Sequence, residues 1–143
     1  MGNRCHSLDP DRRNAVVALS LTYDAGALIA AERGDDRMRA LHEAALAAGM
    51  LPTVPSAVLA QAWRGGPQDR LARVLRGCVI ESLGESRARA VGALCGRAQR
   101  SDIVDACVVL GAGIRGDAIV TSDRDDLEHL ADVLGLTPSI IDV

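Results

Sequence analysis

Short apolar runs alternate with longer amphipathic stretches along almost the whole chain, and this alternation limits the possible folds more than any other feature. The apolar runs have strand length and fall at Val16–Tyr23, Leu51–Val54, Cys78–Ser82, Ala118–Thr121 and Ser139–Val143. Strands separated by helices of ordinary length usually pair in parallel, because each helix returns the chain to the same edge of the sheet. The pattern therefore predicts an α/β fold, a three-layer α/β/α sandwich with a mostly parallel central sheet.

Helix starts and stops divide the intervening stretches. Asp and Ser residues at the starts and Gly residues at the ends are typical helix boundary signals. They predict helices over Ala25–Arg33, Asp36–Ala48, a segment from Ser56 that carries Trp63, Gln68–Arg76, Glu85–Arg97, a segment from Ser101 or Asp102 to Gly111, and Asp123–Leu134.

A glycine-rich segment, Gly111–Gly116, matches the dinucleotide-binding pattern GxGxxG. In a dinucleotide site, the third glycine leads into a helix whose amino end holds the pyrophosphate. Here the apolar run Ala118–Thr121 follows at once and has the character of a strand. We therefore expect the glycines to end a helix and form the turn into that strand.

The chain has 143 residues and a net charge of −3, and hydrophobic residues make up 48% of it. These values predict one domain over residues 16–143, preceded by a flexible leader over residues 1–15. With one Trp, one Tyr and no Phe, the chain lacks an aromatic platform for stacking bases. It has no lysine, which excludes lysine-dependent mechanisms. No membrane-length apolar run and no zinc-like cysteine spacing occur, so we expect a cytoplasmic protein without a membrane partner.

Aspartates follow apolar runs or open helices at three separate places. Asp24 follows the first run, Asp102 and Asp105 open a later helix, and Asp123 and Asp126 follow the fourth run. Each residue alone is most simply a helix cap, because Asp at a helix start bonds free backbone N–H groups. The carboxyl ends of parallel strands meet at one sheet edge, however, so the group is expected to converge there. Clustered carboxylates repel one another unless a cation joins them, which indicates a site for a hard metal ion.

Three segments resemble the motifs of a PIN domain. Leu21–Ala30 resembles the opening strand and helix of that family, Asp105–Leu110 its third-acid helix, and Ile119–Leu127 its closing "T-x-D-x-x-D-[FL]" element. The resemblance covers about Leu19 to Val143, with the motifs in the family's order and spacing. The chain is most similar to the VapC-type toxins of bacterial type II toxin–antitoxin systems.

The resemblance implies a Mg²⁺- or Mn²⁺-dependent endoribonuclease that hydrolyses RNA phosphodiester bonds. Its catalytic and metal-binding residues would be Asp24, Asp105 and Asp123, and Asp102 and Asp126 would be auxiliary metal ligands. The implied partners are an RNA substrate, a cognate antitoxin that docks on the helices within Ala25–Ala48, and a second copy of the chain in a homodimer.

The residues expected to contact substrate depart from the family in one place. Gln61 stands where the family usually has Glu; it offers a carbonyl oxygen but no negative charge. Thr121 and Ser122 precede Asp123 and would orient a carboxylate or a water, although capping of the following helix is the simpler interpretation. The candidate phosphate contacts are Arg64, Arg100 and Arg124.

Two alternative functions stay open at this stage. The missing charge at Gln61 is compatible with a catalytically weak PIN-like module that binds RNA or protein without cleavage. A stand-alone RNA-processing nuclease without an antitoxin is a further alternative.

Overall fold

Five short strands form one sheet in the computed structural model, which describes residues 20–100 and 102–143. The strand order is β3-β2-β1-β4-β5, and every pairing is parallel. The strands are β1 (Leu21–Tyr23), β2 (Thr53–Pro55), β3 (Val79–Glu81), β4 (Ala118–Thr121) and β5 (Ile140–Asp142). The predicted α/β fold is confirmed, and the sheet of the described residues is parallel throughout.

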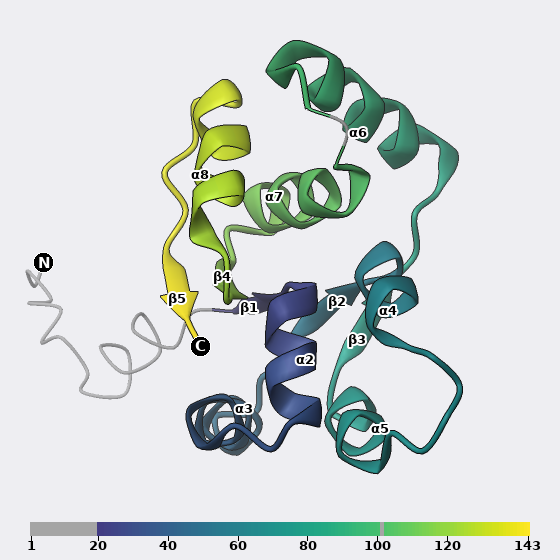
Figure 1. Ribbon diagram of the computed structural model, residues 1–143. Helices are drawn as coiled ribbons and strands as arrows, with labels where there is room; N and C mark the ends of the chain where they lie inside the picture. The colour runs from purple at the N-terminus through teal and green to yellow at the C-terminus, as the bar shows by residue number, and fades with distance from the viewer. Residues whose placement is uncertain (1–19, 101) are drawn as a thin grey trace, which may run out of the picture.

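The helices cover the sheet on both sides, which makes the architecture a three-layer α/β/α sandwich (Figure 1). They are α2 (Ala25–Glu32), α3 (Asp36–Ala47), α4 (Ser56–Ala62), α5 (Asp69–Arg76), α6 (Glu85–Ala98), α7 (Ile103–Arg115) and α8 (Arg124–Val133). In the view of Figure 1, α6, α7 and α8 lie above the sheet, and α2, α3 and α5 lie below it.

Small aliphatic side chains build the core, because the chain offers almost no aromatic ones. The central strand β1 and its neighbour β4 are buried at every residue, and α7 buries much of its length. Strands that are covered on both faces read as continuous apolar runs rather than as alternating ones. The largest fully buried side chains include Tyr23, Leu28, Met38, Leu71, Leu94, Ile119, Leu127 and Leu130.

A buried polar network joins α7 to the sheet. Asp117 lies just before β4, and its carboxylate accepts hydrogen bonds from Thr22 Oγ1 (2.7 Å) and Arg115 Nε (2.8 Å). Arg115 also donates to Thr22 Oγ1 (2.9 Å) and pairs with Glu81 at the end of β3. Glu81 in turn accepts from Arg87 (3.0 Å). Two cations and two anions balance, so each buried charge has a partner of opposite sign.

The helix α7 continues further than the sequence predicted. We expected it to end at Gly111, but Gly111 and Gly113 lie inside it and only Gly116, with φ of 74°, makes the turn into β4. The two inner glycines serve close packing instead. A Cβ on Gly111 would stand 2.9 Å from Glu81 Oε1, and one on Gly113 would stand 2.6 Å from Leu136 Cδ1. The expectation that these glycines do not open a helix is confirmed.

Other predicted boundaries shift by a few residues. The second strand begins at Thr53 rather than at Leu51 and includes Pro55. The first predicted strand started at Val16, but residues 16–19 and the predicted leader over residues 1–15 lie outside the described residues. None of the helices in residues 20–100 and 102–143 combines the length and the apolar character that crossing a membrane requires.

Replacement of Asp117 by alanine is expected to lower the free energy of unfolding by about 3 kcal/mol, because it removes the buried carboxylate that accepts from both Arg115 and Thr22 and balances one of the two arginines. Urea unfolding measures the loss. The matched control is Asp36→Ala, which removes an aspartate that is 88% exposed and pairs with Arg39 on the surface; it should change stability by at most about 0.5 kcal/mol. Equal losses in the two variants would contradict a structural role for the network.

Candidate active site

The strand order reverses direction between β1 and β4, and this place defines the candidate site. From β1 the chain moves toward β2 and β3, and after β4 it moves the opposite way to β5. Consecutive crossovers therefore leave the carboxyl ends of β1 and β4 on opposite faces of the sheet, which opens a crevice between them. Ligands of open parallel sheets bind in such crevices. Asp24 directly follows β1, and Asp123 comes two residues after β4.

Asp24 is buried at the carboxyl end of β1, with an exposed fraction of 6%. Its Oδ1 accepts from the backbone N–H of Ala25 at 2.6 Å and so caps α2, and its Oδ2 accepts from Thr121 Oγ1 at 2.7 Å. Its own backbone N–H donates to the carbonyl of Val120 (3.0 Å). Burial raises the pKa of the carboxyl group above its usual value, and the negative charges of Asp102 and Asp123 raise it further, against the two hydrogen bonds that lower it.

Asp102 and Asp105 approach Asp24 from the start of α7. The side chain of Asp102 caps α7 through the backbone N–H of Asp105, at 3.0 Å. Asp105 lies in the first turn of that helix and is partly buried. Burial raises the pKa of Asp105 to about 7, with added contributions from the charges of Asp102, Asp24 and Asp126 and from a hydrogen bond with the Asp102 side chain. Such a shift is typical of carboxylates that crowd one another without a cation between them.

Asp123 and Asp126 complete the cluster from the start of α8. Asp123 occupies the cap position, yet its side chain makes no capping hydrogen bond. Thr121 takes part of that role, because its Oγ1 accepts from the backbone N–H of Asp123 at 3.0 Å. Thr121 therefore helps to cap α8, and the same hydroxyl also orients the carboxylate of Asp24. The carboxylate of Asp123 stays exposed to solvent.

The predicted acids therefore share one electrostatic environment, here named the acidic cluster: Asp24, Asp102, Asp105, Asp123 and Asp126. No arginine forms an ion pair with any of them among residues 20–100 and 102–143. Across the same residues, however, no three His, Cys, Asp or Glu side chains are arranged closely enough to hold a metal ion. Carboxylate oxygens with unbalanced negative charge are suitable ligands for Mg²⁺ or Mn²⁺. The carboxylates are nevertheless further apart than the ligands of a closed metal site.

The predicted contacts Gln61, Arg64, Arg100 and Arg124 are exposed, and Arg64 lies near Gln68 and Glu32, at the opposite end of α2 from Asp24. Gln61 is an exposed residue of α4, and Arg100 is exposed between α6 and α7. Arg64 donates to the carbonyl groups of Ala60 and Trp63 at the end of α4. Arg124 makes a two-pronged pair with Asp142, at 3.1 and 2.7 Å, and is therefore held against β5.

Two features of the site were not predicted from the sequence. Gly26 in the first turn of α2 faces Ser122, and a Cβ at this position would collide with the Ser122 hydroxyl. Glycine is thus required for α2 and the β4–α8 loop to meet. The second feature is a hydrogen bond of 2.9 Å between the hydroxyl of Tyr23 and Nδ1 of His42, both buried. The position of His42 on the apolar face of a predicted helix could have indicated that this histidine is buried. Nothing in the sequence indicated that its partner is Tyr23, 19 residues away.

The comparisons with known proteins bear on the fold. Neither the models of protein families nor the curated proteins gave a match to this sequence. The structure is similar to the crystal structure of PAE2754 from Pyrobaculum aerophilum, with a TM-score of 0.58 over 86% of this chain and 83% of that chain. The two sequences are 18% identical. A likeness at this level of identity supports a shared fold and says nothing about shared chemistry.

The raised pKa of Asp105 predicts a pH dependence of stability. Between its ordinary value of 3.8 and about 7, the folded chain holds a proton on Asp105 that the unfolded chain has lost. Where the folded state binds more protons than the unfolded state, stability falls as pH rises. The contribution of Asp105 to the free energy of unfolding therefore decreases between these two pH values. Asp105→Asn removes the effect, and we expect the variant to gain stability over the parent chain at pH 8 but much less at pH 4.

Urea unfolding at the two pH values, with EDTA present to remove divalent cations, measures this difference. Asp69→Asn is the matched control, because Asp69 lies in the first turn of α5 just as Asp105 lies in the first turn of α7. A control that alters the pH dependence as strongly as Asp105→Asn would show that crowding in the cluster is not its cause.

Proposed function

We propose that the protein is a metal-dependent endoribonuclease with the PIN-type acidic site, acting as the toxin of a toxin–antitoxin pair. One observation carries the proposal: five carboxylates near the switch point of a parallel sheet lie within electrostatic reach of one another, and no arginine among the described residues pairs with them. Structural carboxylates of the same chain, such as Asp117 and Glu81, do have arginine partners. Unbalanced negative charge from several carboxylates is typical of a site that binds a cation.

Asp24, Asp105 and Asp123 would hold Mg²⁺ or Mn²⁺, with Asp102 and Asp126 as auxiliary ligands. When bound, the ion supplies an activated water and neutralises charge on the phosphate during hydrolysis. Asp24 is the anchor of the set, because Thr121 and the start of α2 fix both of its oxygens. The side chain of Asp123 makes no capping hydrogen bond, so its carboxylate would be available to the ion. Because the pKa of Asp105 is raised, a cation bound by its carboxylate would compete with a proton.

Replacement of Asp24 by asparagine tests the nuclease. The variant should cleave structured RNA at least about 100-fold more slowly than the parent chain, because loss of even outer-shell metal partners costs about 10- to 100-fold. The assay uses purified full-length protein with Mg²⁺ or Mn²⁺ and follows cleavage on a denaturing gel. Asp36→Asn is the matched control, since it removes one exposed aspartate at the start of another helix.

Equal cleavage by the parent chain and Asp24→Asn would exclude the proposed site. Cleavage by neither protein, together with a gel shift of the RNA, would favour the catalytically weak binding module. Two observations give that alternative its support. Gln61 brings no charge, and the carboxylates of the described residues do not form a closed ligand set.

Gln61→Glu tests whether the site is short of charge. A carboxylate here should lower the Mg²⁺ concentration required for half-maximal cleavage by about threefold or more, because cation affinity rises with the number of charged ligands. Ala60→Glu is the matched control, since it adds the same charge to a neighbouring exposed position of α4. The same gain in both variants would mean that any added charge on this helix suffices, and Gln61 would then have no place in the site.

The antitoxin separates the proposed toxin from a stand-alone nuclease. A short reading frame directly upstream that encodes a DNA-binding protein favours the toxin. Its product should form a complex with the chain and abolish cleavage. The helices expected to meet it, α2 and α3, expose the apolar side chains of Ile29 and Leu46.

A further inference from the structure

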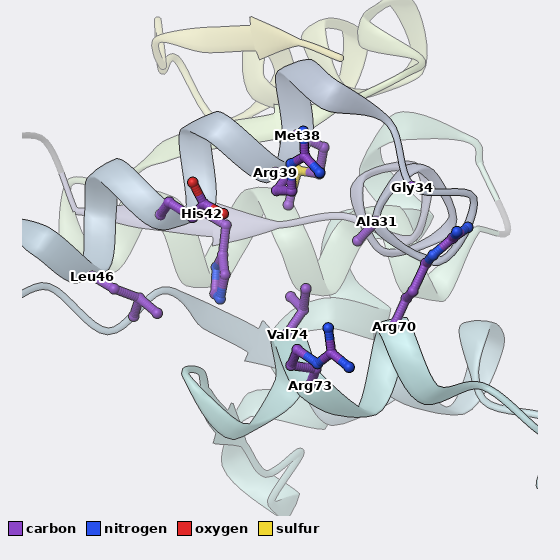
Figure 2. Close-up of a pocket in the computed structure, with 10 residues that line it drawn as sticks. Ala31, Gly34, Met38, Arg39, His42, Leu46, Arg70, Arg73 and Val74 are labelled. Carbon is purple, nitrogen blue, oxygen red and sulfur yellow. The ribbon is translucent and has the colours of Figure 1, made fainter.

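A separate cavity of about 360 Å³ lies between α3 and α5, roughly one helix length from the acidic cluster (Figure 2). Asp24 caps the start of α2, whereas the cavity is lined by Ala31 at the end of that helix and by Gly34 in the following turn. The eight residues of α2 span about 12 Å. The cavity is therefore distinct from the candidate active site, and nothing in the proposed nuclease chemistry uses it.

The inner wall of this cavity is apolar. Met38 is fully buried, and Val74 and Leu46 form the sides, with His42 as the one polar group of the floor. Nδ1 of His42 is already bonded to Tyr23, and burial lowers the pKa of the imidazole, so the floor is uncharged near neutral pH. An apolar ligand body fits such a wall.

The rim of the cavity carries an excess of positive charge. Arg70 and Arg73 come from α5, and Glu43 is the one carboxylate among the lining residues. Arg39 of α3 also lines the cavity, but it pairs with Asp36. Figure 2 shows the arginine side chains on both sides of the cavity, with Val74 and His42 between them. In residues 20–100 and 102–143, neither Arg70 nor Arg73 forms an ion pair.

Arg70 is placed by the turn between α2 and α3. A Cβ on Gly34 would stand 2.9 Å from Nη1 of Arg70, so the guanidinium lies directly over this glycine. Gly34 also has φ of 77°, a conformation that favours glycine. Gly34 thus forms the turn and leaves room for the guanidinium group of Arg70 at the edge of the cavity.

We propose that this cavity binds a small amphiphilic anion, with its apolar body against Leu46 and Val74 and its carboxylate, sulfonate or phosphate at Arg70 and Arg73. The volume of about 360 Å³ lies in the range of small-molecule sites, which begin at about 300 Å³. Guanidinium groups bind carboxylate and phosphate through paired hydrogen bonds, so the anionic group of the ligand is expected at Arg70 and Arg73.

Two dyes with the same ring system test the proposal. Anilinonaphthalene sulfonate carries a negative charge, and N-phenyl-1-naphthylamine lacks it. Fluorescence titration of the full-length protein should give one saturable site for the charged dye. Octanoate should displace this dye, and octanol, which has the same chain length without the charge, should not.

The double variant Arg70→Gln and Arg73→Gln should bind the charged dye on the order of fivefold or more weakly, with binding of the neutral dye unchanged. Arg76→Gln is the matched control, because Arg76 is an exposed arginine of α5 that does not line the cavity. Urea unfolding verifies that all variants are folded, since the charged dye also binds partly unfolded chains.

Three results would overturn the proposal: no saturable binding, an equal loss in the Arg76 control, or displacement by octanol as effective as by octanoate. None of these measurements depends on RNA cleavage. The proposal and the proposed nuclease function therefore succeed or fail separately.

Discussion

The parallel pairing of β1 with β4 is the constraint on which the site depends. It brings Asp24 and Thr121, which are 97 residues apart in the chain, into a hydrogen bond of 2.7 Å. The same hydroxyl accepts from the backbone of Asp123, so one threonine aligns the ends of two strands and the starts of two helices. Because the crossovers leave these strands toward opposite faces, the topology places the ligand-binding edge of the sheet at the strand ends that Thr121 joins.

The buried and partly buried carboxylates of this chain have two different environments. On the inner side of α7, Asp117 and Glu81 are matched by Arg115 and Arg87, and the result is a neutral network that holds the helix on the sheet. At the amino end of the same helix, Asp105 meets further carboxylates and no matching arginine, and its pKa rises to about 7. The first arrangement stabilises the fold, whereas the second costs stability and is compatible with a site that receives a cation.

Much of the fold was predictable because local signals agree with one another. The alternation of apolar runs and capped helices fixed the class and the parallel sheet, and Asp102 caps α7 as its position indicated. The length of α7 was not predictable in this way. Gly111 and Gly113 read as helix stops, yet Glu81 and Leu136 pack against them from distant parts of the chain. Glycine that makes room for a neighbour cannot be told from glycine that ends a helix without the neighbour in view.

The sequence by itself determined which acids stand at strand ends and helix starts, since spacing and capping chemistry are local properties. Only the tertiary structure decided how those acids interact. It showed that Thr121 orients Asp24, that Asp123 makes no capping hydrogen bond, and that burial and neighbouring carboxylates raise the pKa of Asp105 to about 7. It also placed Arg70 over Gly34 beside an apolar cavity. These outcomes depend on distances between segments far apart in the chain, and burial and charge repulsion act through such distances.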